Sequence, residues 1–155
     1  QAHISTDDRT TTVAAKKRAK DTNEECSAIQ LNDGTMITAG SSVLLGTCAS
    51  LLLNALKHLA GIDHSVKLIS QDFIEPIQKT KVDYLGGNNP RLHMDEVLVA
   101  LSVLSLNDSN CRRALAMLPE LKGLQAHATV MLSQVDQKIL KKLGISLTCD
   151  PASKK

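Results

Sequence analysis

The sequence predicts an α/β fold, in which a small mixed sheet is packed with helices. Stretches with apolar residues at helical spacing interleave with short alternating stretches along the chain, a pattern that favours a sheet covered by helices over a helical bundle. A chain of 155 residues with 43% hydrophobic residues can bury a core of its own. We find no internal repeat, so we expect a single domain over residues 1–155.

The N-terminal part predicts a helix followed by a β-hairpin. We expect the helix from about residue 7 to residue 20, where a cluster of Lys and Arg near its end suits the negative end of the helix dipole. Two strands, 28–31 and 35–38, flank the dipeptide Asp33-Gly34, which supplies the positive φ angles that a tight hairpin turn requires. The charge cluster therefore has a structural explanation.

Two further helices are expected next, with a short alternating segment between them. Gly40-Ser41-Ser42 ends the hairpin and caps a helix to about Leu59, after which Gly61 is the expected stop. Residues 66–69 alternate between apolar and polar side chains, so they could form a strand. Ser70 can then cap the next helix.

The C-terminal half predicts a loop, three helices and two strands. Apolar residues recur at helical spacing after a Gly/Asn-rich loop, and polar residues separate two consecutive helices. Ser133 and Asp136 form a capping pattern at the start of the last helix, and Gly144 is its expected stop. The expected elements are the loop 86–90, helices near 94–104, 110–118 and 134–143, and strands 125–132 and 145–148.

Composition argues against nucleic acid and membranes as partners. The formal charge is +2, the basic residues are dispersed, and Phe73 and Tyr84 are the two aromatic residues, so stacking platforms for bases are lacking. The longest apolar stretch, 43–56, is interrupted by polar residues and is too short to span a bilayer. The chain begins without a signal pattern or an initiator Met, so we expect a trimmed chain or a fragment.

The four cysteines indicate reduced thiols and no metal site. Cys26, Cys48, Cys111 and Cys149 are widely spaced, whereas zinc ligands usually come in pairs at short spacing. Two of them fall in predicted helices among apolar neighbours, where a free thiol behaves as a small hydrophobic group. We therefore expect a cytoplasmic protein with no metal and no cofactor.

Several segments, in order and over nearly the whole chain, match one bacterial family. The matching residues are Ala2-His3-Ile4-Ser5 with Asp7-Asp8-Arg9, Leu51 to Asp63, Ile74-Glu75-Pro76-Ile77-Gln78, Asn89-Pro90-Arg91-Leu92-His93 with Asp95-Glu96, Ala126-His127 with Thr129-Val130, and Leu143-Gly144-Ile145 with Thr148-Cys149. On these segments the chain resembles the C-terminal part of the proteins catalogued as domain of unknown function 1846, also called uncharacterised protein family 0371.

The resemblance implies a fold and a larger parent protein, but no reaction. Members of the family are much longer, so the chain would correspond to about their last third and would have a missing N-terminal domain as its partner. The fold implied is a three-layer α/β topology similar to that of cytidine deaminases. That chemistry needs a His-x-Glu pair and a Pro-Cys-x-x-Cys pair to hold zinc, and neither motif occurs here. We therefore expect the topology without the zinc motif.

The first candidate site is the start of the helix that follows the Gly/Asn-rich loop. Free backbone N–H groups at a helix start attract anions, and Arg91 can fork onto a phosphate or carboxylate with His93 beside it. The alternative is structural: Asn89 caps the helix, Pro90 takes its first position, and Arg91 pairs with Asp95 or with a missing domain.

The second candidate site is the pair His127 and Thr129, which share one face of a predicted strand. At a strand end such a pair could bind substrate or carry protons. Alternatively, both side chains hydrogen-bond a neighbouring strand or cap, which is the commoner role of a single strand histidine. Ligand-binding candidates are therefore Asn89, Arg91, His93, His127 and Thr129, and no residue has an assigned catalytic role.

Two functions remain open on these grounds. In the first, the chain is a structural or assembly domain that contacts the missing N-terminal domain or another subunit as a homo-oligomer. It would then leave an apolar patch exposed. In the second, it forms part of an enzyme site for a small anionic ligand, with Arg91 and His93 facing His127 and Thr129 across a cleft. The second hypothesis requires those side chains to converge.

Overall fold

A computed structural model describes residues 9–150 of the chain. Helices and strands are interspersed along the chain as the sequence predicts, so the protein is an α/β protein. In order, the elements are α1 (Thr10–Thr22), β1 (Cys26–Gln30), β2 (Met36–Gly40), α2 (Thr47–Leu59), α3 (Gln71–Lys79), the π-helical turn η2 (Thr80–Tyr84), α4 (Met94–Leu104), α5 (Ser109–Leu115), the 3₁₀ turn η3 (Leu118–Leu121), β3 (Gln125–Ala128), α6 (Gln134–Lys142) and β4 (Ser146–Cys149).

The strands form one mixed sheet with the order β2-β1-β3-β4. β1 is antiparallel to both β2 and β3, whereas β4 runs parallel to β3. The hairpin between β1 and β2 turns at Gly34, whose φ of 90° favours glycine. Helix α6 connects β3 to its parallel neighbour β4, because parallel strands cannot be joined by a tight turn. The expected small mixed sheet is confirmed.

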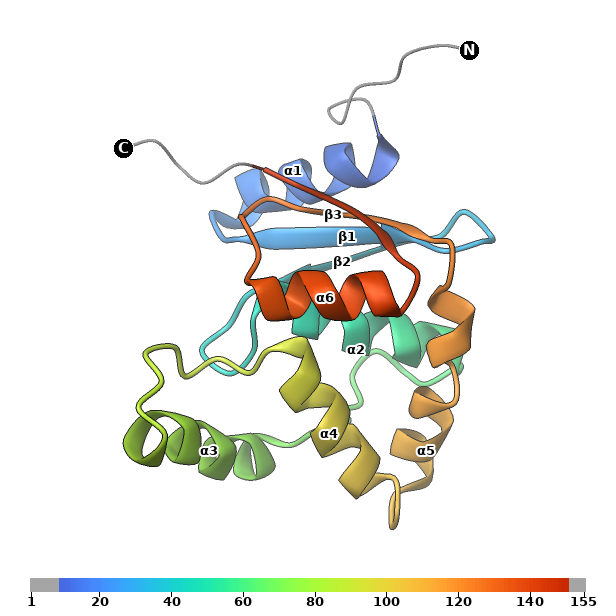
Figure 1. Cartoon of the computed structure of the whole chain (residues 1–155). Coiled ribbons are helices and arrows are strands. Elements are labelled where there is room, and N and C mark those ends of the chain that lie inside the picture. The colour runs from blue at the N-terminus through green and yellow to red at the C-terminus, as the bar shows by residue number, and fades with distance from the viewer. Residues whose placement is uncertain (1–8, 151–155) are drawn as a thin grey trace.

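Helices cover both faces of the sheet. Figure 1 shows α1 on one face and α2 and α6 on the other, with α4 and α5 beyond α2. Helix α3 lies at the far end from α1 and projects from the body. None of the helices within residues 9–150 is long and apolar enough to cross a membrane.

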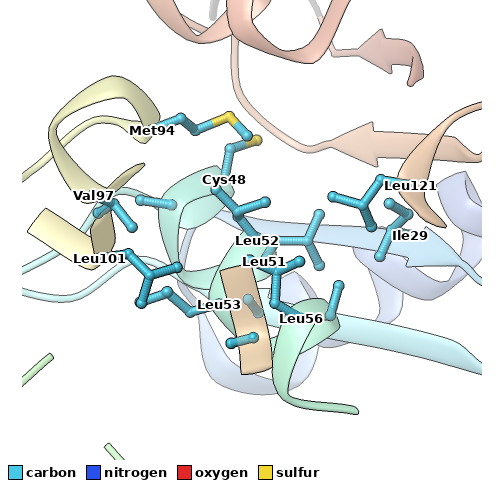
Figure 2. Packing of buried hydrophobic residues seen from close by; sticks show 14 of the residues in the cluster. Ile29, Cys48, Leu51, Leu52, Leu53, Leu56, Met94, Val97, Leu101 and Leu121 are labelled. Carbon is cyan, nitrogen blue, oxygen red and sulfur yellow. The ribbon is translucent and has the colours of Figure 1, made fainter. Parts of the chain in front are cut away.

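The hydrophobic core lies on the α2 face. Leucines of α2 meet the apolar side of α4 and residues of the sheet (Figure 2). Leu56, Val97, Leu101 and Leu121 are among its most deeply buried side chains. Each is removed from water almost completely, which stabilises the fold by about 1.5–3 kcal/mol per large side chain. This face therefore supplies most of the apolar burial among the described residues.

Several element boundaries differ from the sequence-based expectation. Helix α5 ends at Leu115, earlier than the expected residue 118. Helix α1 begins at Thr10, and residues 7 and 8, where its start was expected, lie outside the described residues. Helix α2 begins at Thr47 because the Ser42 hydroxyl accepts hydrogen bonds from the backbone of Leu44 and Leu45 instead of capping the helix. β3 ends at Ala128, earlier than the expected residue 132.

The expected strand at residues 66–69 is wrong. Leu68 and Ile69 are buried, but no strand lies beside them to complete a ladder. Side chains bond the backbone carbonyls of this segment instead of a strand. Lys57 donates to the carbonyl of Val66, and the Cys111 thiol donates to that of Leu68. The segment is a buried connection whose alternation reflects core contacts.

Candidate functional site

His127 is the centre of a hydrogen-bonded chain between the sheet and α1. It lies in β3, directly opposite Thr148 of the parallel strand β4, and its side chain is 0% exposed. Its Nδ1 is 2.7 Å from the Thr148 hydroxyl, and its Nε2 is 3.0 Å from Oδ1 of Asp150. The same Asp150 oxygen is 3.8 Å from Nζ of Lys16 on α1. The network thus joins two strands to the helix above them.

The partners of His127 define its hydrogen bonding. A carboxylate can only accept, so Nε2–H donates to Asp150 and Nδ1 accepts from the Thr148 hydroxyl. Burial lowers the pKa of His127, and the hydrogen bond and charge of Asp150 offset this only in part. The imidazole is therefore neutral near pH 7. A neutral histidine with both nitrogens bonded inside the fold acts here as a structural link.

Thr129 hydrogen-bonds a neighbouring strand, as the structural alternative to a ligand-binding role predicts. Its hydroxyl accepts from the backbone N–H of Cys26 at 3.0 Å, and its own N–H donates to the carbonyl of Cys26 at 2.8 Å. These two bonds extend the β1–β3 pairing by one residue beyond the ladder. The side chain of Thr129 is therefore engaged with β1.

The start of α4 is occupied by the protein's own carboxylates. Glu96 accepts from the backbone N–H of His93 at 2.8 Å, and Asp136 of α6 accepts from that of Met94 at 2.9 Å. The side chain of Asp136 is itself positioned by the turn that Ser133 caps. Because these acids take the N–H groups that would attract an anion, the arrangement disfavours an external anion at this helix start.

Glu96 is also held by a lysine. Nζ of Lys81 is 2.8 Å from Glu96 Oε1, and it donates as well to the carbonyl of Arg91. Burial raises the pKa of Glu96, but hydrogen bonds from Lys81 and the His93 backbone outweigh it and leave the pKa below its ordinary value. This ion pair ties η2 to α4 and keeps the helix start in place.

Asn89 and Arg91 belong to a loop contact and not to the helix cap. Asn89 Oδ1 accepts from the Arg91 backbone N–H at 3.0 Å, and Arg91 Nε donates to the carbonyl of Ser42 at 2.6 Å. The helix is capped at His93, so the expected capping by Asn89, with Pro90 as first helical residue, is wrong. Arg91 likewise bonds Ser42 where a pair with Asp95 was the expected alternative.

The two candidate sites do not meet. His127 bonds Asp150, which lies beside Lys16 of α1, whereas Arg91 bonds Ser42 in the segments that precede α2 and α4, and α1 lies on the opposite side of the sheet from these two helices (Figure 1). The single cleft required by the ligand-binding hypothesis is therefore not formed by these residues. Within residues 9–150 there is also no group of three His, Cys, Asp or Glu side chains able to hold a metal ion.

An apolar groove between α3 and α4 is the feature that sequence reasoning missed. Its volume is about 500 Å³, and Asp72, Asp95 and Glu96 lie at its edge. Val99 and Val103 of α4 are 65% and 52% exposed in it. We call it the α3–α4 groove; its apolar lining is Phe73, Pro76, Ile77, Val99, Ala100 and Val103.

The sequence of α4 contains a pattern that could have indicated the groove. That helix carries apolar residues on more than one face, and Val99 and Val103 do not fall on the stripe that packs against α2. A helix that is apolar beyond its core-facing stripe is typical of a surface that another element covers. The partner cannot be found from spacing alone.

The fold and these sites together define an α/β domain with a polar, internally bonded layer under α1 and an exposed apolar groove at its other end. Its sequence places it more closely: residues 7–155 match the family model described as "Domain of unknown function DUF1846, C-terminal". The chain belongs to this family. The resemblance seen in the sequence is thereby confirmed.

Relatives in other bacteria are similar over nearly the whole chain. A UPF0371 protein of Corynebacterium aurimucosum is 50% identical over 151 residues, which cover 97% of this chain and 30% of the relative. A UPF0371 protein of Streptococcus thermophilus is 43% identical over 148 residues, covering 96% of this chain and 30% of the relative. The chain thus spans under a third of the length of these relatives and corresponds to their C-terminal domain.

Proposed function

We propose that this chain is a structural domain for assembly, which packs through the α3–α4 groove against the region that precedes it in the longer proteins of its family. The observation that carries the proposal is the exposure of Val99 and Val103 in a groove of about 500 Å³. Contiguous exposed apolar surface of this kind marks sites that a partner covers. The chain would fold as one domain and act in the cytoplasm.

The length of the relatives supports an intramolecular partner. This domain accounts for 30% of the C. aurimucosum protein, so most of that chain lies outside the matched region and is available to cover the groove. Asp72 and Asp95 among the lining residues favour a segment that carries Lys or Arg beside its apolar side chains, because Glu96 is already paired with Lys81. An amphipathic helix with basic flanks fits both features.

The position of α3 also supports the proposal. Helix α3 projects from the body (Figure 1), and Ile74 is its one buried residue. A helix with so little apolar burial of its own gains stability when a partner packs against its free side. Pro76 is exposed, and together with the half-buried Ile77 it lines the groove.

Cysteine labelling tests the proposal. Val103→Cys would be made in a Cys149→Ser background, because Cys149 is the partly exposed thiol while Cys26, Cys48 and Cys111 are buried. Maleimide labelling would be measured in this chain alone and in a chimera, in which the chain replaces the C-terminal domain of the 50% identical C. aurimucosum protein. The matched control is Val13→Cys on α1, because Val13 is also exposed but lies on the opposite layer.

We expect Val103→Cys to label rapidly in the isolated chain and at least about tenfold more slowly in the chimera, as burial of a side chain in an interface requires. Val13→Cys should label equally in both. Equal labelling of Val103→Cys in both proteins would overturn the proposal. Slow labelling already in the isolated chain, together with a dimer in light scattering, would replace the intramolecular partner by a second copy.

A further inference from the structure

A second hollow, separate from the α3–α4 groove, lies between α2 and the segment 66–71. Its volume is about 260 Å³. Leu45, Leu53 and Ile74 contribute apolar walls, and Lys57 and Lys67 are among its other lining residues. None of the residues that line it is acidic.

Lys57 is the buried part of this site. Lys57 is only 8% exposed. Its Nζ donates hydrogen bonds to the carbonyls of His64 and Val66, at 2.9 Å in each case. An ammonium group has three N–H donors, so one remains after these two bonds. Burial and the neighbouring charge of Lys67 lower the pKa of Lys57, and the opposing effect of Asp63 is smaller.

Lys67 adds positive charge that no described acidic side chain pairs with. Within residues 9–150 no carboxylate forms an ion pair with Lys57 or Lys67. Asp63, the acid nearest in effect to Lys57, accepts from the backbone and hydroxyl of Ser65. Buried charges are normally paired, so Lys57, which bonds two carbonyls but no acid, leaves a negative counter-charge to be supplied from outside, and the exposed Lys67 adds positive charge to the same lining.

The polar side chains of α2 face the same place. Ser50, Asn54 and Lys57 follow one another at the i, i+4, i+7 spacing of one helix face, and all three line the hollow. The amide nitrogen of Asn54 donates to the carbonyl of Thr38, which fixes the orientation of its side chain. A neighbouring hollow shares Asn54 and Lys57 and is lined by Arg18, His58 and His64, again with no acidic residue. Neither hollow is therefore lined by an acidic residue, although the charge of Asp63 acts on Lys57 from nearby.

We propose that this hollow binds a small organic anion, a carboxylate or phosphate monoester with a short apolar body. The anionic group accepts hydrogen bonds from the third N–H of Lys57 and from Lys67, and the apolar body lies against the leucine and isoleucine walls. Pockets of this kind combine apolar walls with a few polar groups that fix orientation. The site is independent of the groove and of the assembly proposed for it.

Ligand-dependent stability provides the test. Thermal unfolding of the full chain would be measured with acetate, hexanoate, inorganic phosphate and hexyl phosphate at constant ionic strength, because a ligand that binds the folded state raises its melting temperature. Hexanoate or hexyl phosphate should raise the melting temperature more than acetate or phosphate. A larger rise of the melting temperature with hexanoate would identify the anion as a carboxylate. A larger rise with hexyl phosphate would identify it as a phosphate ester.

Two variants separate the site from general salt effects. Lys67→Ala removes an exposed charge that makes no hydrogen bond in the fold, so the chain should stay folded and bind about tenfold more weakly, as loss of a charge-assisted hydrogen bond predicts. Lys57→Met should abolish binding. The matched control is Lys17→Ala, an exposed lysine paired with Asp21 on α1.

The outcomes are distinct. An unchanged melting temperature with all four anions would overturn the proposal, and so would equal shifts in the parent chain, Lys67→Ala and Lys17→Ala. If Lys57→Met fails to fold, Lys67→Ala and a two-dimensional NMR titration still decide. The side-chain amide signal of Asn54 must then move with hexanoate or hexyl phosphate in the parent chain and stay in place in Lys67→Ala.

Discussion

The two faces of the sheet are packed in different ways. On the α2 face, leucines from several helices close over Ile29 and its neighbours. On the α1 face, Ala15 is the one buried apolar residue of the helix, and it lies beside the buried hydroxyl residues Thr11 and Thr12. One face is held by apolar area, whereas the other is oriented by a few side-chain hydrogen bonds and also buries the hydroxyls of Thr11 and Thr12, which have no hydrogen-bond partner among the described residues.

The contacts of α1 show how such a layer holds. Arg18 donates to the Thr38 hydroxyl at 2.9 Å, and the hydroxyl of Thr10 donates to the side chain of Gln30 at 2.7 Å. Each bond contributes only about 0.5–1.5 kcal/mol net, because the same groups bond water in the unfolded chain. The comparison teaches that α1 is oriented by specific bonds, whereas the α2 face carries the bulk of the stability.

The largest effect is expected on the α2 face. Leu101→Ala removes a side chain that is fully buried between α4 and α2, so the free energy of unfolding should fall by about 2–5 kcal/mol. Val103→Ala, two residues further on the same helix but half exposed, should cost less than about 1 kcal/mol. Urea unfolding followed by circular dichroism measures both. Equal losses would show that this face does not dominate.

The buried hydroxyl of Thr47 on the same face should contribute to the free energy of unfolding. Thr47 at the start of α2 donates to the carbonyl of Ala39 at 3.0 Å and is 2.8 Å from the hydroxyl of Ser27. Thr47→Val leaves the carbonyl of Ala39 without this bond, whereas Ser27 can still donate to the backbone carbonyl of Thr47 at 3.1 Å, so the free energy of unfolding should fall by about 1–3 kcal/mol. A loss below about 0.3 kcal/mol in the same urea assay would contradict this interpretation.

The pH dependence of stability tests the α1 face. Because burial lowers the pKa of His127 in the folded state, the unfolded chain takes up its proton first as the pH falls. The stabilisation is therefore complete above about pH 6.5, the ordinary histidine value, and is lost as the pH falls through the lower folded pKa. His127→Gln should be less stable than the parent at pH 8 by about 1–2 kcal/mol, since Thr148 and Asp150 lose a well-placed partner.

The variant isolates this histidine from other groups. The pKa values of Asp33, Asp63 and Glu96 are also lowered. The contribution of these acids to the free energy of unfolding is lost at more acidic pH, and it is the same in the parent chain and in His127→Gln. The difference between the two proteins should therefore shrink between pH 8 and pH 5. A constant difference over that range would mean that His127 does not titrate with unfolding.

Local chemistry made much of the fold predictable. The β1–β2 hairpin has its turn at Gly34. Ser70 and Ser133 cap their helices, because their hydroxyls accept hydrogen bonds from the backbone N–H groups of Phe73 and Asp136. Gly144 has the positive φ of a helix stop. In each case one or two neighbouring residues decide the conformation. The errors arose where distant contacts decide it: residues 66–69 have no neighbouring strand, and the Ser42 hydroxyl is used by a turn before α2.

The candidate site was less predictable for the same reason. The strand position of His127 followed from the sequence, but its pairing with Thr148 depends on the register of β4, which no local pattern encodes. Likewise, Asp136 reaches the start of α4 across a separation of 42 residues. The sequence therefore indicated which residues are polar and where they lie, but not which of them already satisfy one another.

The smallest expected effect has the opposite sign and separates the two faces most sharply. Thr11 on α1 is fully buried, and its hydroxyl has no hydrogen-bond partner. Burying such a group without a bond costs free energy, whereas an apolar group of the same shape does not. Thr11→Val should therefore raise the free energy of unfolding by about 0.5–1 kcal/mol. The same substitution at Thr47, also buried but bonded to Ala39 and Ser27, should lower it. If Thr11→Val also destabilises the chain in urea unfolding, its hydroxyl is bonded in solution, and the α1 layer is more completely hydrogen-bonded than its contacts in the fold show.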